Sequence, residues 1–295
     1  LPYKEHPAFN RFAEDLIKIL RLNLPHQDAL EHIRFLLPFH IYLYGIETSA
    51  AWAGREGWQF FVCEIPGPKM DVVRRASIGN RDENEALGVE GMRRYIQQTL
   101  IRDERVVEIL DPNFRTDVEE KDRASELATE LQRLFFLNEA QTADLNKLET
   151  REDVRAAIHA EAAKAYRSGT LSALESLGRE AGLIDSRGTT KKRYAPTDHL
   201  IRALVFANLS DDSHVEESDF LAILRIRYGL VFGPREAVGT ICEHNPQHYD
   251  EADFKRNQSR LSRRLVGLGL GNSMSDSCTY VVNPLGISVD KAVPA

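Results

Sequence analysis

The amino-acid sequence predicts a mainly α-helical protein with small β elements, arranged in two or three domains. Its 295 residues are more than one hydrophobic core usually fills, and its 42% hydrophobic and 28% charged residues are ordinary for a folded protein. Over most of the chain, apolar residues recur every three or four positions, as they do on one face of a helix. Runs of aromatic and β-branched residues, which are typical of strands, are short.

The first half of the chain combines long helical patterns with one strand. Residues 39–53 are apolar nearly all round, so we expect this helix to be buried. The aromatic run Trp58–Ile65 predicts a strand, which we expect to form a short hairpin with residues 72–77. Helices are expected over residues 8–24, 28–37, 39–53, 84–110 and 119–149. The first predicted domain, a helical domain with a short β-hairpin, is residues 1–148.

The second half predicts shorter helices and one clear strand. The strand Thr279–Val282 lies between a turn rich in Ser and Asp and the dipeptide Asn283-Pro284. Helices are expected over residues 151–166, 171–181, 198–209, 220–228 and 253–268, with another beginning near Pro234. A polar linker at residues 211–215 separates two further predicted domains, residues 149–210 and 211–295.

The composition excludes several classes of protein. Lys and Arg total 38 against 45 Asp and Glu, so the net charge of −7 excludes a uniformly basic coat, although not a local basic face. The longest apolar runs, such as Phe35–Tyr44, are too short to span a bilayer. The three cysteines are widely spaced and odd in number, which favours a reducing compartment. The chain starts without the basic and apolar regions of a signal peptide, so we expect a cytoplasmic protein.

The most informative segment is residues 255–264, which holds five basic side chains and no acidic one within a predicted helix. These are Lys255, Arg256, Arg260, Arg263 and Arg264. The four arginines follow the i, i+4, i+7, i+8 spacing of one helix face, so we expect them to project from the same side. Leucines occupy the opposite side and can pack on a core. A charge run of this kind is often only a solvated face, and that alternative stays open.

Three short polar residues, Asn257, Gln258 and Ser259, lie near the start of this helix. In helix-turn-helix complexes, base edges and phosphates lie at that position. The helix is followed by a turn and the strand Thr279–Val282. A helix followed by a two-stranded hairpin is the order of a winged helix, in which the recognition helix precedes the wing. The sequence therefore predicts a winged-helix domain over residues 211–295.

A second segment has the same order of elements. The predicted helix at residues 171–183 is followed by a turn that contains Gly188 and by Tyr194 and Pro196. Four basic residues lie in this turn: Arg187, Lys191, Lys192 and Arg193. Cations at the tip of a hairpin can contact a phosphate backbone or enter a minor groove. Because Glu175, Glu180 and Asp185 lie close, an exposed loop whose charges serve solubility is the alternative.

Two stretches resemble winged helix-turn-helix units: LGREAGLIDSRGTTKKRYAPTDHLIRALV and NQSRLSRRLVGLGLGNSMSDSCTYVVNPL. The linking stretch FLAILRIRYGLVFGPREA is similar to segments of helical proteins encoded beside phage-defence or DNA-translocating ATPases in bacteria. The resemblance covers roughly residues 165–285, and its motifs are not catalytic. It implies a DNA-recognition or scaffolding subunit rather than an enzyme, with one or two winged-helix domains. For residues 1–150 we identify no resemblance.

The sequence lacks the common motifs of enzymes. It contains no GxxxxGK[ST] phosphate loop, no GxSxG nucleophile elbow, no HExxH and no CxxC. The glycines at 267, 269 and 271 are expected to end a helix rather than to bind a dinucleotide. Glu119-x-Lys121, with Asp111 and Asp117 before it, matches a Mg²⁺-dependent nuclease by letters, but its context predicts the start of a helix instead of a strand.

A zinc site is the remaining cofactor hypothesis. Cys242, His244 and His248, together with Asp250 or Glu251, could supply four ligands. The second cysteine of a zinc finger is missing, and Asn245-Pro246 predicts a loop without fixed geometry. We therefore expect surface histidines, no metal and no cofactor.

Two hypotheses follow for the function. In the first, the chain is a non-enzymatic DNA-binding and assembly subunit of a bacterial anti-phage complex, whose partners are double-stranded DNA and other subunits such as an ATPase or a nuclease. The predicted DNA contacts are Arg256, Asn257, Ser259, Arg260, Arg263, Arg264, Lys191, Lys192 and Arg193. In the second, the chain is a protein–protein adaptor whose winged helices bind a partner protein instead of DNA. No membrane partner is expected.

Overall fold

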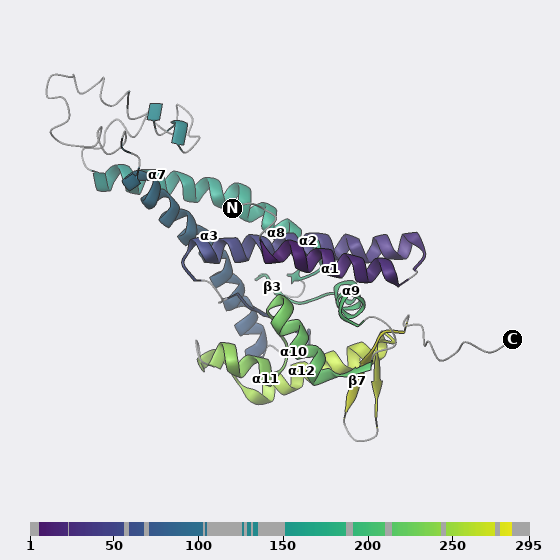
Figure 1. The fold of residues 1–295 in the computed structure, drawn as a ribbon. Coiled ribbons are helices and arrows are strands. Elements are labelled where there is room, and N and C mark those ends of the chain that lie inside the picture. The colour runs from purple at the N-terminus through teal and green to yellow at the C-terminus, as the bar shows by residue number, and fades with distance from the viewer. Residues whose placement is uncertain are drawn as a thin grey trace, which may run out of the picture. The chain divides into compact units, whose positions relative to one another are not determined.

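The computed structural model describes residues 6–22, 24–55, 59–67, 71–102, 151–186, 191–209, 214–242, 246–274 and 278–284, with isolated positions between 104 and 134. It confirms the mainly helical class with small sheets (Figure 1). The α-helices are α1 (Pro7–Arg21), α2 (His26–Trp52), α3 (Val72–Arg102), α7 (Arg151–Tyr166), α8 (Ser172–Glu180), α9 (Asp198–Asn208), α10 (Glu217–Tyr228), α11 (Pro234–Ala237) and α12 (Glu251–Gly267). Within the described residues, no helix is both long enough and apolar enough to cross a membrane.

Short strands and irregular helical turns connect these helices. The strands are β1 (Phe61–Val62), β2 (Ile184–Asp185), β3 (Arg193–Tyr194), β4 (His214–Glu216), β5 (Leu230–Val231), β6 (Gly271–Ser273) and β7 (Thr279–Val282). Two π-helical turns, η3 (Arg167–Leu171) and η4 (Val238–Cys242), continue α7 and α11, and a 3₁₀ turn, η5 (Pro246–His248), precedes α12.

The chain divides into two compact units that are not consecutive stretches of sequence. The first unit combines Leu1–Glu47, Trp58–Asn84 and Leu174–Ala295, and the second combines Thr48–Gly57 and Glu85–Ala173. The predicted domains 1–148, 149–210 and 211–295 are consecutive, so the structural division differs from them. Periodicity predicts where a helix lies, but it does not predict which helices share a core.

The N-terminal β element differs from the sequence prediction. Residues 72–77 belong to α3, so the predicted hairpin with the first strand is wrong. β1 pairs instead in parallel with β5, with Phe61 opposite Leu230 and Val62 opposite Val231. β1 and β5 are separated by about half the chain. Their pairing leaves no local sequence signal, because the packing of the intervening helices determines which strands meet.

α2 replaces two predicted helices. It runs through Pro38, where the sequence predicted a break. A proline inside a helix removes one backbone hydrogen bond, but here Pro38 and Phe39 are buried in the packed interior of the first unit. Tertiary packing therefore overrides the local preference.

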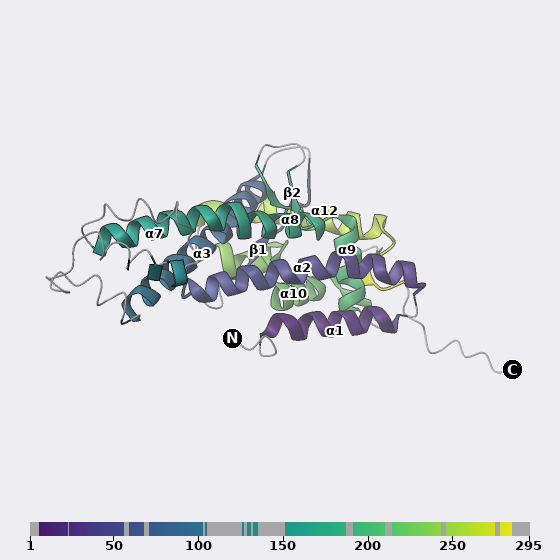
Figure 2. The ribbon, with the colours of Figure 1, turned by 90° about the horizontal axis from the view of Figure 1, so that it is seen from above.

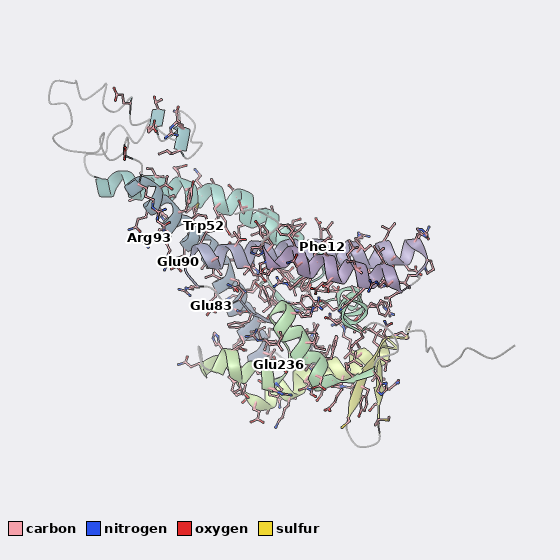
Figure 3. All side chains as sticks on the ribbon, in the orientation of Figure 1. Phe12, Trp52, Glu83, Glu90, Arg93 and Glu236 are labelled. Carbon is pink, nitrogen blue, oxygen red and sulfur yellow. The ribbon has the colours of Figure 1, made fainter. Side chains whose placement is uncertain are left out.

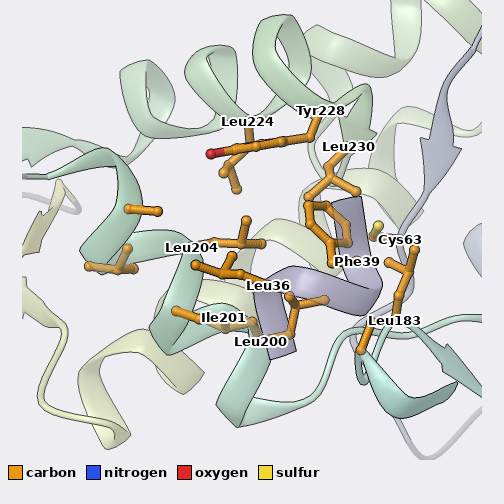
Figure 4. Close-up of a cluster of buried hydrophobic side chains, with 14 of the residues drawn as sticks. Leu36, Phe39, Cys63, Leu183, Leu200, Ile201, Leu204, Leu224, Tyr228 and Leu230 are labelled. Carbon is orange, nitrogen blue, oxygen red and sulfur yellow. The ribbon is translucent and has the colours of Figure 1, made fainter. Parts of the chain in front are cut away.

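The core of the first unit joins N-terminal and C-terminal helices. Leu36 and Phe39 of α2 lie against Leu204 of α9 and Tyr228 of α10 (Figure 4). All four side chains are at most 2% exposed. A second buried cluster surrounds β1 and β5 and includes Phe254 at the start of α12. These two cores fix the position of α12, which carries the predicted DNA contacts.

At the C-terminal end, the hairpin follows α12 as the sequence predicted, but β4 (His214–Glu216) falls on the predicted polar linker and was not expected. α9, β4, α10, α12, β6 and β7 follow one another, with β5 and α11 inserted between α10 and α12. β6 and β7 form an antiparallel hairpin, and β7 also pairs with β4, so the strand order is β4-β7-β6. In the second segment, β2 and β3 form a hairpin after α8. The winged-helix assignment of both segments stays a prediction.

Candidate functional site

The predicted basic helix exists as α12 and leads directly into the hairpin of β6 and β7 (Figure 1). Its first turn is capped by Asp250, whose carboxylate accepts a hydrogen bond from the backbone N–H of Asp253 at 2.8 Å. Phe254, Leu261 and Leu265 are buried on its inner side, as the sequence predicted for the leucines. The positions of the polar side chains therefore decide what this helix can bind.

Asn257 is fully buried and cannot contact DNA, so its predicted role is wrong. Its side-chain amide donates to the backbone oxygens of Cys63 and Phe232, each at 2.9 Å, and accepts from the backbone N–H of Ile65 at 2.7 Å. These bonds connect α12 to the chain that follows β1 and to the chain that follows β5. A polar residue at this position is required inside the molecule, because strand ends leave backbone groups that need partners.

Arg260 and Arg264 are also held within the fold. The guanidinium of Arg260 donates to Asp71 at 2.8 Å, and both side chains are largely buried. Arg264 forms an ion pair with Asp198 and donates to the backbone oxygen of Pro196 at 3.0 Å. Asp71 and Asp198 neutralise these two arginines, and part of each guanidinium group is bonded within this chain, so the structure does not support their predicted position along a DNA groove.

Three of the predicted DNA contacts, Arg256, Ser259 and Arg263, are exposed on α12. Arg256 is exposed and forms an ion pair with Asp253 on its own helix. Ser259 and Arg263 are exposed, and the Arg263 guanidinium donates to the backbone oxygen of Ser259 at 3.2 Å. Lys255 lies one turn earlier and pairs with Glu251 at 2.5 Å, which raises the pKa of the Lys255 ammonium. We call Lys255, Ser259 and Arg263, at i, i+4 and i+8, the outward face of α12.

The second basic segment is also largely committed to the fold. Arg193 of β3 is buried and pairs with the fully buried Glu64, and it lies 3.6 Å from Asp185. Its predicted contact with DNA is wrong, because burial removes it from any ligand. Glu64 is shared with Arg74 at 2.7 Å.

The lysines of this segment lie nearer the surface. Lys192 forms an ion pair with Glu175 of α8. Burial by itself raises the pKa of the Glu175 carboxyl. The hydrogen bond from Lys192 and the charges of nearby arginines outweigh burial and lower this pKa. Lys191 is exposed, and Arg187 lies outside the described residues. Lys191 is exposed and Lys192 is partly exposed, so the DNA contacts of these two lysines stay a prediction.

The structure does not assemble the predicted metal or nuclease sites. His244 and the side chain of Cys242 lie outside the described residues, as do Glu119 and Lys121. Among the residues that are described, no group of three His, Cys, Asp or Glu side chains lies close enough to hold a metal ion.

An apolar surface on α1 and α2 is exposed, although for the aromatic cluster Phe35–Tyr44 the sequence favoured a core position over a partner surface. Residues 39–53 were expected to be buried, but Ile41 and Tyr44 are exposed, and so is Trp52. On α2, the exposed apolar side chains recur at i, i+7, i+11 and i+14, which places them on one helix face. The exposed set, which we call the α1–α2 apolar surface, is Phe9, Ile17 and Leu20 of α1 and Leu30, Leu37, Ile41 and Tyr44 of α2.

Ring contacts place the two helices side by side. The ring of Phe9 lies 5.3 Å from that of Tyr44, and the ring of Phe12 lies 5.4 Å from that of His40. Both views show α1 running along α2 (Figures 1 and 2). The signal was present in the sequence: α2 is apolar on more faces than one core can cover.

Comparison with family models, with curated proteins and with solved structures gave no match for this chain.

Proposed function

We propose that this protein is a non-enzymatic assembly subunit that binds a protein partner through the α1–α2 apolar surface. The observation that supports this proposal is the exposure of seven large apolar side chains, between 36% and 63%, on two adjacent helices. Large exposed apolar patches are uncommon on soluble proteins and are typical of protein interfaces. This is the protein–protein adaptor hypothesis, but with the α1–α2 apolar surface instead of the winged helices as the surface that contacts the partner.

The partner that we propose is another subunit of a bacterial complex, such as an ATPase or a nuclease. This rests on the resemblance of residues 165–285 to proteins encoded beside phage-defence or DNA-translocating ATPases. A helix face of this kind is recognised by a partner that carries complementary apolar side chains. Burying one leucine or isoleucine contributes about 1.5–3 kcal/mol to the free energy of binding, before the costs of association.

The test compares two aspartate substitutions at positions whose side chains are equally exposed to solvent. Ile41 on the α1–α2 apolar surface and Val266 on α12 are both 41% exposed. The tagged chain is purified from its native host, the partner that accompanies it is identified, and the complex is rebuilt from purified proteins. We expect Ile41→Asp to weaken the rebuilt complex by about tenfold or more and Val266→Asp to leave it unchanged. Equal affinity of both variants and the wild type would overturn the proposal.

A second candidate function is duplex DNA binding by the outward face of α12, with the β6–β7 hairpin as the wing. The strand order β4-β7-β6 and the exposure of Lys255, Ser259 and Arg263 support it. On α12, this contact set adds Lys255 to the predicted contacts Ser259 and Arg263 and omits Arg256, Asn257, Arg260 and Arg264. Because phosphate contacts release counterions, binding of this kind falls steeply with salt.

Charge reversal on α12 tests this second candidate. The double variant Lys255→Glu with Arg263→Glu is compared with the double variant Arg21→Glu with Arg34→Glu, which reverses the charge of two exposed arginines on α1 and α2. Fluorescence anisotropy with a labelled duplex at two salt concentrations measures binding. We expect the α12 variant to lose binding and the control to keep it. Absence of binding by the wild type, or equal losses in both variants, removes the DNA hypothesis.

A further inference from the structure

A cavity of about 510 Å³ lies within the second unit, between α3 and the end of α7. Its lining includes Arg93, Arg94 and Gln97 of α3 together with His159 and Arg167. Glu90 and Arg93 lie about one turn apart on α3 (Figure 3). This volume is within the range of about 300–1,000 Å³ that is usual for small-molecule sites.

The cavity is positively charged in an acidic protein. Its lining contains three arginines and one glutamate. Glu90 pairs with Arg94 at 3.4 Å and with Arg55 at 3.3 Å, so this carboxylate is already shared. Within the described part of the chain, Arg93 and Arg167 form no ion pair with a carboxylate. Among the residues that the structure describes, no carboxylate therefore neutralises these two guanidinium groups.

His159 adds a third donor to these two. Its Nε2 atom is buried and has no hydrogen-bond partner in the described structure. Burial lowers the pKa of the His159 imidazole, and the charges of Arg93 and Arg167 lower it further, which places both guanidinium groups near the ring. A buried nitrogen without a partner is costly, and an anionic oxygen that accepts from it removes that cost.

The backbone at Arg167 is unusual. Arg167 is the first residue of the π-helical turn η3, which interrupts the helical path from α7 to α8. π-helical turns are rare and occur frequently at functional sites. The turn therefore places Arg167 where the helical path from α7 to α8 changes.

We propose that this cavity binds the phosphate group of a small phosphate monoester, held by Arg93, Arg167 and the Nε2 atom of His159. Three arginines against one glutamate leave two positive charges, which match the charge of about −2 on a phosphate monoester at neutral pH. Guanidinium groups bind phosphate through paired hydrogen bonds. Ala86 and Val89 supply an apolar wall for the organic part of the ligand, as in a nucleotide or a sugar phosphate.

This site is independent of the proposed partner surface, because the two share no residue. The test uses the full chain and isothermal titration calorimetry with adenosine 5′-monophosphate, inorganic phosphate and a short DNA duplex as probes. We expect the monophosphate to bind, and Arg93→Gln or Arg167→Gln to weaken binding by about tenfold or more. Arg102→Gln, an exposed position on the same helix, is the matched control and should bind as the wild type does.

A second measurement distinguishes a built site from general attraction of anions. The ring C–H resonances of His159 are followed by NMR while the monophosphate is added, and we expect them to move in the wild type and in Arg102→Gln. Circular dichroism confirms that the variants are folded. Inorganic phosphate that binds and shifts His159 also supports the proposal. Absence of binding by the monophosphate and by phosphate, equal binding by all variants, or binding of the duplex alone would overturn it.

Discussion

The buried side chain of Asn257 stabilises the fold through hydrogen bonds with three backbone groups. Its amide satisfies the oxygens of Cys63 and Phe232 and the N–H of Ile65. We expect Asn257→Ala to destabilise the protein by about 3 kcal/mol, because three buried backbone groups lose their partner. Urea denaturation measures this. Ser259→Ala, at an exposed position two residues later, should change stability by less than about 0.5 kcal/mol. Similar midpoints for both variants would contradict this account.

Glu217 couples stability to pH. Burial raises the pKa of its carboxyl group, against the hydrogen bond from Ser262, and the nearby Glu236 raises it further. Because the folded pKa is the higher one, the neutral form favours folding. This contribution is fully present below the ordinary pKa of 4.5 and is lost as pH rises through the raised value.

The substitution Glu217→Gln removes this dependence. We expect the stability of the glutamine variant relative to the wild type to increase between pH 4 and pH 8, as measured by thermal unfolding at each pH. Glu216→Gln makes the same change at the exposed neighbouring position and serves as the control. A constant difference between Glu217→Gln and the wild type at all pH values would show that Glu217 does not titrate in this range.

At the scale of elements, the end of α10 depends on one glycine. Gly229 has a φ of 73°, in the left-handed region, and its N–H donates to the backbone oxygen of Arg225 at 3.0 Å. A Cβ atom at this position would lie 2.7 Å from the backbone oxygen of Gln59, beside β1. The glycine therefore ends the helix and also lets β5 approach β1.

We expect Gly229→Ala to destabilise the protein by about 1–3 kcal/mol, since it adds backbone strain and a clash with a neighbouring main chain. At Gly267, in the last turn of α12, an added methyl group would meet no neighbouring atom within 4 Å. Gly267→Ala is therefore the control and should be neutral or slightly stabilising. Chemical denaturation distinguishes the two, and equal effects would contradict the role assigned to Gly229.

At the scale of the whole molecule, the first unit is built from three separate stretches of chain. The fragment 149–295 would correspond to the two predicted C-terminal domains, but it lacks Leu36 and Phe39 of α2 and the strand β1, which complete its core. We expect this fragment alone to lack a cooperative thermal transition, and co-expression with fragment 1–148 to restore one. A fragment 149–295 that unfolds cooperatively by itself would support the consecutive domains instead.

The helical class, most helices of the second half and the hairpin after α12 were predictable, because amphipathic spacing, glycines and prolines act locally. The leucine stripe of α12 was also predictable, and it lies inside as expected. Of the predicted DNA contacts, Lys191, Arg256, Ser259 and Arg263 are exposed in the structure. The parallel pairing of β1 with β5 was not predictable, since it joins residues about 170 positions apart.

The sequence by itself determined that α12 would carry a dense set of cations on a helix that leads into a β-hairpin. Only the tertiary structure decided which of these cations are available. Arg260 lies beside Asp71, and Arg264 lies beside Asp198, each from a distant part of the chain. A charge pattern in sequence shows which side of a helix is polar, but the elements that fold against that side decide whether its charges meet solvent or a carboxylate of the same molecule.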